Sequence, residues 1–131
     1  MDTYSWYSTL IKPSWAPPAE VFGPVWFVLY SIIIVSFGFV FYKAWKREVP
    51  RGIACIFFLN IVFNLAFSPL QFTLQNNILA SIDIVLIFVT LVWALASIYK
   101  HVKWVALVNI PYLLWVSFAT VLQLTITWLN Q

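Results

Sequence analysis

Apolar residues fill four long stretches of this chain, at residues 21–42, 52–74, 78–99 and 104–131. Three of the stretches contain no charged residue, and the third contains only Asp83. A bilayer core of roughly 30 Å needs about 20 helical residues, so each stretch is long enough to cross a membrane. Residues 32–35 and 53–58 lack the alternation of apolar and polar positions that barrel strands show. The pattern predicts an all-α, polytopic transmembrane helical bundle with four spans.

The polar positions between these stretches predict an orientation. Four Lys and Arg residues lie in the loop at 43–52 and two more in the loop at 100–103, whereas Lys12 is the one Lys or Arg of the other segments. Because Lys and Arg concentrate in cytoplasmic loops, the two basic loops are expected to be cytoplasmic and both termini to face outward. The tryptophans suit two interfacial belts, with Trp45 and Trp104 at the basic side and Trp6, Trp15 and Trp128 opposite.

Composition narrows the class further. Of the 131 residues, 63% are hydrophobic and 8% are charged, against about a quarter charged in soluble domains, so no water-facing surface can be assembled. The length suits a single domain over residues 1–131. The single cysteine, Cys55, excludes a disulfide framework, and no partners for a metal ion are present. The net charge of +3 is clustered in loops, as membrane topology requires, and predicts no nucleic-acid partner.

A proline-rich segment precedes the first span. Residues 6–30 follow the pattern WYxxLxKPxWxPPxxxFxPVWxxLY. Pro13, Pro17 and Pro18 fix the backbone angle φ and exclude a helix there, which predicts a rigid extended stretch at the membrane surface. Pro24 is tolerable in the first turn of the helix that follows.

Two further motifs lie inside the spans. Residues 64–69 read NLAFSP and residues 111–122 read PYLLWVSFATVL. Together with the N-terminal pattern they resemble the TspO/translocator protein family, the tryptophan-rich sensory or peripheral benzodiazepine receptor family, from about Trp6 to Asn130. The sequence departs from that family at Phe67, where a tryptophan is usual, and at Gln123, where an asparagine is usual. The family also has five spans, so either this is a four-span variant or a first helix lies upstream of Met1.

The resemblance implies a ligand cavity and the residues that line it. It would be an apolar, aromatic-lined cavity open towards the outer side and capped by residues 12–18. The ligand-binding positions carried over are Tyr7, Pro18, Phe22, Trp26, Asn64, Phe67, Asp83, Trp115, Ala119 and Leu122.

Each of these polar or aromatic positions also has a structural explanation. Trp115 shares a helical face with Pro111 and Ala119, so it either packs between helices or offers a flat wall to a ligand. Asn60 and Asn64 are one turn apart and suit hydrogen bonding between helices. Asp83 is an intramembrane carboxyl group, which marks either a buried polar network or the polarity of a pocket. Pro111 either kinks the last helix or marks its start.

Function follows from the resemblance, because no phosphate-binding loop, catalytic triad or carboxylate pair is present. The family implies a membrane protein that binds porphyrins or other tetrapyrroles for sensing, sequestration or transport, with no cofactor. Two alternatives are light-dependent porphyrin breakdown, and a scaffold or assembly subunit without a ligand. The expected partners are a small apolar ligand, the bilayer and, as an alternative, a second copy of the chain. The expected location is a bacterial cell membrane.

Overall fold

The computed structural model describes residues 10–16, 22–70 and 74–130, with the backbone alone at Phe22 and Ser68. Helices account for nearly all of these residues, and the described part of the chain contains no strand. In chain order they are α2 (Phe22–Trp45), α3 (Arg51–Ser68), α4 (Asn77–Tyr99), α5 (Lys103–Val108) and α6 (Ile110–Leu129). The predicted all-α helical bundle is confirmed.

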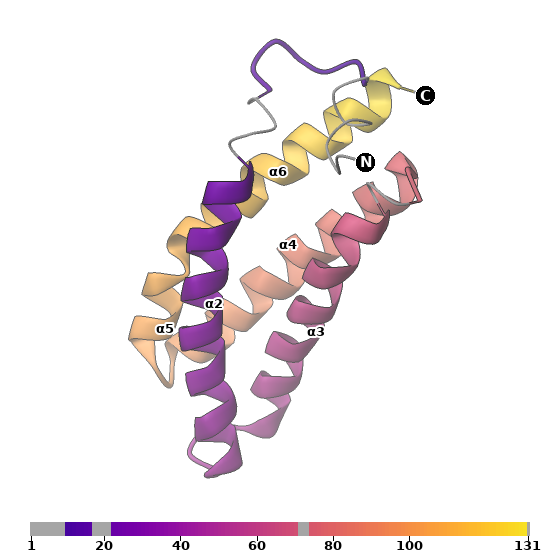
Figure 1. Ribbon diagram of the computed structural model, residues 1–131. Helices are drawn as coiled ribbons and strands as arrows, with labels where there is room; N and C mark the ends of the chain where they lie inside the picture. The colour runs from indigo at the N-terminus through magenta and orange to yellow at the C-terminus, as the bar shows by residue number, and fades with distance from the viewer. Residues whose placement is uncertain (1–9, 17–21, 71–73, 131) are drawn as a thin grey trace.

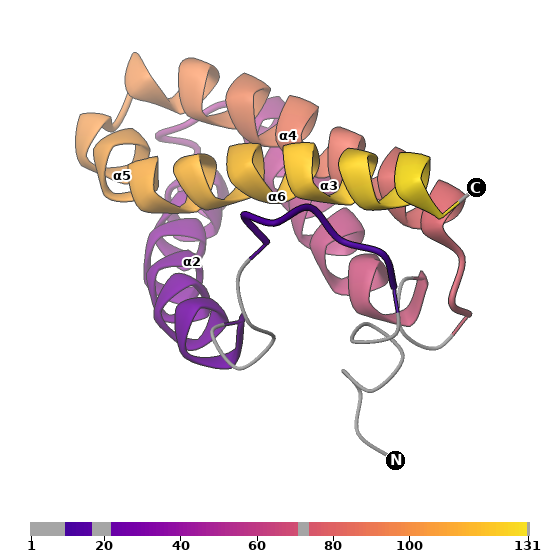
Figure 2. The same cartoon turned by 90° about the horizontal axis from the view of Figure 1, so that it is seen from above.

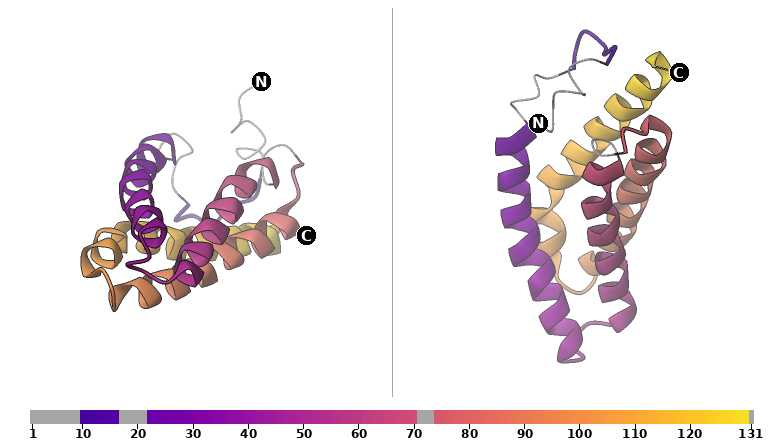
Figure 3. Two further views of the ribbon diagram at one scale, coloured as in Figure 1. Left: turned by 90° about the horizontal axis from the view of Figure 1, so that it is seen from below. Right: turned by 45° about the vertical axis from the view of Figure 1, so that its right-hand side comes forward.

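The helices run alternately up and down (Figure 1). The loop between α2 and α3 and the loop between α4 and α5 both lie at the lower end of the bundle, as the views in Figure 3 also show. The two clusters of Lys and Arg residues therefore share one end. This arrangement agrees with the expectation that both loops lie on one side of a membrane.

Within the described part of the chain, three helices are long and apolar enough to cross a membrane: Gly23–Trp45, Asn77–Tyr99 and Ile110–Leu129. The second predicted span is shorter than expected, since α3 ends at Ser68 and does not continue to Leu74. The backbone continues through Pro69 (φ −58°, ψ −41°) and Leu70 as a short π-helical turn. The polar turn after it begins the next helix, because the side-chain oxygen of Asn76 accepts a hydrogen bond from the backbone N–H of Leu79 at 3.0 Å.

The fourth predicted stretch is divided in two. Asn109 separates α5 from α6, and Pro111 occupies the first turn of α6. Proline is accommodated there because the first turn of a helix has no intrahelical partner for its N–H. Of the two alternatives for Pro111, a kink or the start of a helix, the structure has the start.

The core is centred on α4, which packs against α3 on one side and α6 on the other (Figure 2). Its buried residues recur at helical spacing, from Ala80 through Ile84, Ile87 and Leu91 to Ile98. Many large apolar side chains on the outer faces of the bundle are exposed, among them Phe27, Ile34 and Leu114. Lipid is the solvent that such a surface requires.

The described N-terminal segment, residues 10–16, lies along α6 (Figure 2). The backbone N–H of Ile11 donates to the Asn130 side-chain oxygen at 3.1 Å, and the Asn130 amide donates back to the Ile11 carbonyl at 2.9 Å. Further along, the ring of Trp15 meets Phe118 edge-on at 5.8 Å. The segment is thus fixed at both ends to one helix.

Candidate functional site

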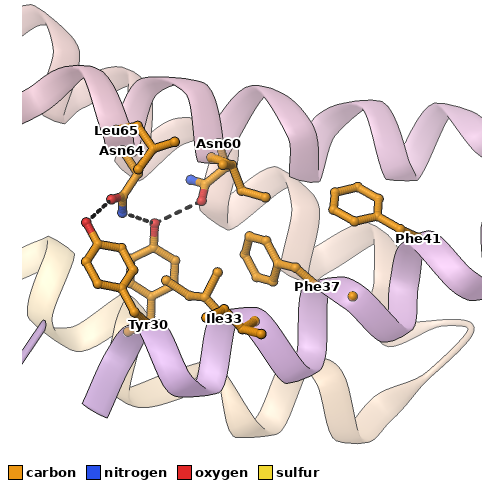
Figure 4. Close-up of a pocket in the computed structure, with 11 residues that line it drawn as sticks. Tyr30, Ile33, Phe37, Phe41, Asn60, Asn64 and Leu65 are labelled. Carbon is orange, nitrogen blue, oxygen red and sulfur yellow. Dashed lines mark hydrogen bonds between the residues drawn. The ribbon is translucent and has the colours of Figure 1, made fainter. Parts of the chain in front are cut away.

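A cavity lies between α2 and α3, beside the middle of α2 (Figure 4). Its volume is about 610 Å³. Ile34 and Leu65 line it and are 72% and 63% exposed, so the cavity opens sideways towards lipid. Its wall consists of Tyr30, Ile33, Ile34, Phe37, Gly38, Phe41, Asn60, Ile61, Asn64, Leu65 and Tyr112.

The cavity exists because α2 and α3 diverge. They join at the lower end and separate towards the upper end, while α3 packs closely on α4 (Figures 1 and 3). At Gly38, which faces the gap, a β-carbon would meet no atom within 4 Å. The space beside α2 is therefore open at this position.

A chain of hydrogen bonds crosses one end of the cavity wall, at the left in Figure 4 and on the far side from the basic loops. The hydroxyl of Tyr30 donates to the Asn64 oxygen at 2.9 Å, and the Asn64 amide donates to the hydroxyl of Tyr112 at 2.8 Å. Tyr112 in turn donates to the Asn60 oxygen at 2.9 Å. Because Asn60 and Asn64 are one helical turn apart, both amides face the same phenol.

The chain continues into the core. The Asn60 amide donates to the carbonyl of Ile87 and to the hydroxyl of Thr90, both at 3.0 Å. The Thr90 hydroxyl donates to the carbonyl of Leu86 at 2.7 Å. The series of bonds therefore links α2, α3, α6 and α4, and it satisfies polar groups that would otherwise be costly in an apolar interior.

Aromatic rings complete the wall. Trp26 is half-buried, and its ring centroid lies 5.3 Å from that of Tyr30 and 6.5 Å from that of Tyr112. Below them Phe37 lies 6.4 Å from Tyr112 and meets Phe57 edge-on at 4.6 Å. These ring contacts fix the orientation of the aromatic side chains. A rigid aromatic ligand packs best against rings that are fixed in this way.

Trp115 lies at a second, shallower hollow of about 410 Å³ on α6, lined by Pro111, Leu114, Trp115 and Phe118. Its ring contacts Phe118 at 5.6 Å, and Phe118 is also the contact of Trp15. Of the two tryptophans carried over from the family, Trp26 therefore adjoins the larger cavity and Trp115 adjoins the N-terminal segment.

The other predicted ligand positions are distributed through the bundle. Asn64 lines the larger cavity, whereas Phe67 and Ala119 are half-buried against the main core. Leu122 is buried in a smaller cluster with Leu10, Ala16, Ile126 and Phe118. Asp83 is buried on α4, and none of the residues that the structure describes forms a hydrogen bond with its Oδ2. The predicted positions Tyr7 and Pro18, and the side chain of Phe22, lie outside the described residues.

Residues 12–18 are expected to cap the cavity, but those of them that the structure describes do not lie over it. Residues 12–16 lie along α6, and the cavity between α2 and α3 opens towards lipid rather than beneath them. Residues 17 and 18 are outside the described ranges. The part of the proline-rich segment that is described therefore supports α6 and the Trp115 hollow.

Sequence reasoning did not include Tyr30, Phe37 and Tyr112 among the ligand positions. A signal for the two tyrosines was available. Asn60 and Asn64, one turn apart in an apolar span, require long polar partners at a similar depth, and tyrosine hydroxyls on the neighbouring helices supply them. No such signal identifies Phe37, because nothing in the sequence distinguishes it from the other phenylalanines of the same apolar helix.

Comparison with known proteins gives matches over nearly the whole chain. The model of the TspO/MBR family matches residues 1–129. The tryptophan-rich protein TspO of Chlorobaculum tepidum is 38% identical over 128 residues, covering 96% of this chain and 80% of that protein. The protein of the same name from Bacillus cereus is 36% identical, with 96% and 81% covered. The human translocator protein is 32% identical, with 90% and 70% covered.

Apolar helices of spanning length, an exposed apolar surface and a laterally open aromatic cavity define a multi-pass helical membrane protein. Its sequence match extends over nearly the whole chain. The protein belongs to the TspO/MBR family.

Proposed function

We propose that the protein binds a flat, mostly apolar ligand of the tetrapyrrole class in the cavity between α2 and α3. The observation that carries the proposal is the wall itself, which combines the rings of Tyr30, Phe37, Phe41 and Tyr112 with one chain of hydrogen bonds at one end. Small-molecule sites combine apolar and aromatic walls with a few placed polar groups, at volumes of about 300–1,000 Å³. Membership of the family supports the tetrapyrrole class, in a sensing, sequestering or transport role.

The polar group best placed to orient the ligand is the amide of Asn64. One of its hydrogens is donated to Tyr112, and a second remains on the same nitrogen. A ligand carbonyl or carboxyl group that reaches this nitrogen would receive a hydrogen bond inside the bilayer. The ring of Tyr30, which is 38% exposed and contacts Trp26, would lie against the ligand face.

The wall also favours a mode of tetrapyrrole binding that does not require a metal ion in the ligand. The usual axial ligands of haem iron are histidine, cysteine, methionine and tyrosine, and of these the wall contains only tyrosines. The hydroxyls of Tyr30 and Tyr112 already donate to amides. Binding would therefore rest on stacking, apolar contact and the hydrogen bond from Asn64, without a bond to a metal.

Gly38 offers a direct test. Gly38→Leu places a side chain into open space in the cavity, and leucine favours a helix more than glycine does, so the fold should be retained. Gly52→Leu is the matched control, because it also meets no atom within 4 Å and lies outside the cavity. Protoporphyrin is titrated into each protein and tryptophan fluorescence is followed.

We expect saturable 1:1 quenching in the parent protein, at least tenfold weaker binding in Gly38→Leu, and a change within about twofold in Gly52→Leu. Unchanged affinity in Gly38→Leu would remove the ligand from this cavity. No saturable binding in the parent protein would refute the function itself.

Light-driven porphyrin breakdown is the second candidate. The oxidisable rings of Trp26, Tyr30 and Tyr112 form a contact series at the cavity, which favours electron transfer to a photoexcited ligand with dissolved oxygen as the oxidant. A new absorbing product under illumination, absent in Trp26→Phe, distinguishes breakdown from simple binding.

The proposed orientation places the basic end in the cytoplasm. The support is the positive-inside rule together with the shared end of the two basic loops. The bacterial relatives from Chlorobaculum tepidum and Bacillus cereus favour a bacterial cell membrane.

A further inference from the structure

The basic end of the bundle carries an organised surface that ligand binding in the cavity does not use. Six of the seven Lys and Arg residues lie there, namely Lys43, Lys46, Arg47, Arg51, Lys100 and Lys103. Among the described residues at this end, Glu48 is the one carboxylate. The surface therefore has a strong positive charge.

Two aromatic rings from different helices meet at this end, and a lysine lies close to each of them along the chain. Phe39 of α2 and Trp104 of α5 have ring centroids 5.0 Å apart, so they join the end of α2 to the start of α5. Lys43 lies one turn beyond Phe39, with its Nζ 5.3 Å from the Phe39 ring. Lys103 immediately precedes Trp104. We call the contact of Phe39 and Trp104, together with the neighbouring residues Lys43 and Lys103, the seam; the Lys103 ammonium itself lies over the ring of Tyr99.

The seam lies at the depth of a membrane interface. Tyr42, Trp45, Tyr99 and Trp104 are all exposed at this end, and large aromatic side chains prefer the headgroup region. Nζ of Lys46 lies 5.4 Å from the ring of Tyr42, and Nζ of Lys103 lies 5.5 Å from that of Tyr99. These contacts hold the ammonium groups close to the rings, near the level where lipid phosphates lie.

Lys43 is partly neutralised by the protein. Its Nζ donates to Glu48 at 2.7 Å, and this hydrogen bond and the charges of Lys43 and Lys46 lower the pKa of Glu48. The carboxylate therefore competes for Lys43 with any external anion. Two further hydrogens remain on the ammonium group.

We propose that the seam binds the phosphate headgroup of an anionic phospholipid. Lys43 and Lys103 donate to the phosphate, the exposed edge of Trp104 packs against the glycerol region, and the acyl chains follow the apolar surface of α5, where Leu107 is 60% exposed. Basic clusters next to membrane helices attract anionic lipids by about fivefold in affinity per Lys or Arg. A soluble phosphate ester lacks the acyl chains and gains none of the apolar contact.

The test uses the full-length protein and short-chain phosphatidylglycerol, with bound lipids counted by native mass spectrometry. Lys43→Gln/Lys103→Gln removes the seam charges. Lys46→Gln/Arg51→Gln is the matched control, because it removes the same charge from the same end and leaves the seam intact. Phosphatidylcholine and glycerol 3-phosphate serve as the uncharged-lipid and free-phosphate comparisons.

We expect the seam variant to lose at least tenfold more affinity for phosphatidylglycerol than the control variant loses, because the control removes only the general attraction of two charges. Glu48→Gln should strengthen binding by about two- to threefold, because it releases Lys43. Equal losses in both double variants would mean diffuse attraction without a site, and no loss in either would also overturn the proposal. So would tight binding of phosphatidylcholine, or full competition by glycerol 3-phosphate.

Discussion

Asn64 donates a hydrogen bond of 2.8 Å to the hydroxyl of Tyr112, and this one contact joins the last turns of α3 to the start of α6. Both groups are buried, and Tyr112 passes the interaction on to Asn60. The pair fixes the upper edge of the cavity, because Tyr112 also contacts Trp26 and Phe37 through its ring.

Removing the phenol oxygen should destabilise the bundle. Tyr112→Phe leaves the Asn64 amide and the Asn60 oxygen without this partner in an apolar interior, so the free energy of unfolding should fall by about 1–2 kcal/mol. Thermal unfolding in detergent measures the loss. Tyr99→Phe, at an exposed position of the basic end, is the control and should lie within about 0.5 kcal/mol of the parent protein. Equal stability of both variants would contradict the assigned role of the Tyr112 hydroxyl.

The two tryptophans carried over from the family should differ in their effect on ligand binding. Trp26 supports Tyr30 and Tyr112 at the cavity, so Trp26→Leu should weaken porphyrin binding by about 1–2 kcal/mol, or roughly five- to thirtyfold. Trp115→Leu, at the hollow on α6, should change it by less than threefold. Absorbance titration of the ligand avoids the loss of fluorescence signal. The opposite ranking would place the ligand against α6.

Metal should matter little to binding. The cavity wall lacks histidine, cysteine, methionine and carboxylate side chains, so metal-free and zinc protoporphyrin should bind within about threefold of each other. Competition between the two ligands measures this ratio directly. A preference of more than tenfold for the zinc form would indicate an axial ligand outside the wall described above.

The attachment of residues 10–16 to α6 should depend on Asn130. Asn130→Ala removes both side-chain hydrogen bonds to Ile11, at a cost of about 1–2 kcal/mol to the local closed state. Hydrogen exchange of the Ile11 amide should accelerate by about five- to thirtyfold, while amides in the centre of α4 keep their protection. Unchanged exchange at Ile11 would mean that Trp15 and the cluster around Leu122 suffice to hold the segment.

Glu48 should titrate at lower pH than an isolated glutamate. Lys43 lowers its pKa through a hydrogen bond and through its charge, so the favourable interaction is present above the unfolded-state pKa. It is lost as the pH falls through the lower folded-state value. Carboxyl NMR should show the midpoint of Glu48 rising in Lys43→Gln. An unchanged midpoint would show that the pair is too screened by solvent to matter.

The hydrophobic pattern predicted the helical class and the grouping of both basic loops, because lipid leaves few alternatives for a backbone. It did not predict that α3 ends at Ser68 or that Asn109 divides the last stretch. The break at Asn109 depends on a tertiary contact, since the buried Asn109 amide donates to Ser36 of α2 at 2.9 Å as well as to the carbonyl of Val105 in α5. A contact between residues so far apart along the chain has no signature in local composition.

The candidate site was likewise predicted only in part, because contacts between distant segments have no signature in local composition. Asn64 could be assigned from its position in an apolar span and from the family resemblance, and it does line the cavity. That Trp26 and Trp115 adjoin different hollows depends on how α6 rotates against α2, which a motif does not specify. Gln123 has a structural role that the sequence did not predict. Its side chain is buried, and its amide donates to Thr127 at 3.2 Å and to Asn77 at 3.4 Å. The bond to Asn77 connects α6 to the start of α4.

The sideways opening beside Ile34 and Leu65 changes what a measured affinity refers to. A ligand that enters there is drawn from the hydrocarbon phase, where an apolar molecule is enriched over water by its partition coefficient. The apparent dissociation constant, referred to total ligand, should therefore rise in proportion to the amount of lipid or detergent present. Expressed as a mole fraction within the bilayer, the same constant should stay fixed, and that is the scale on which the protein competes with its own membrane for the ligand.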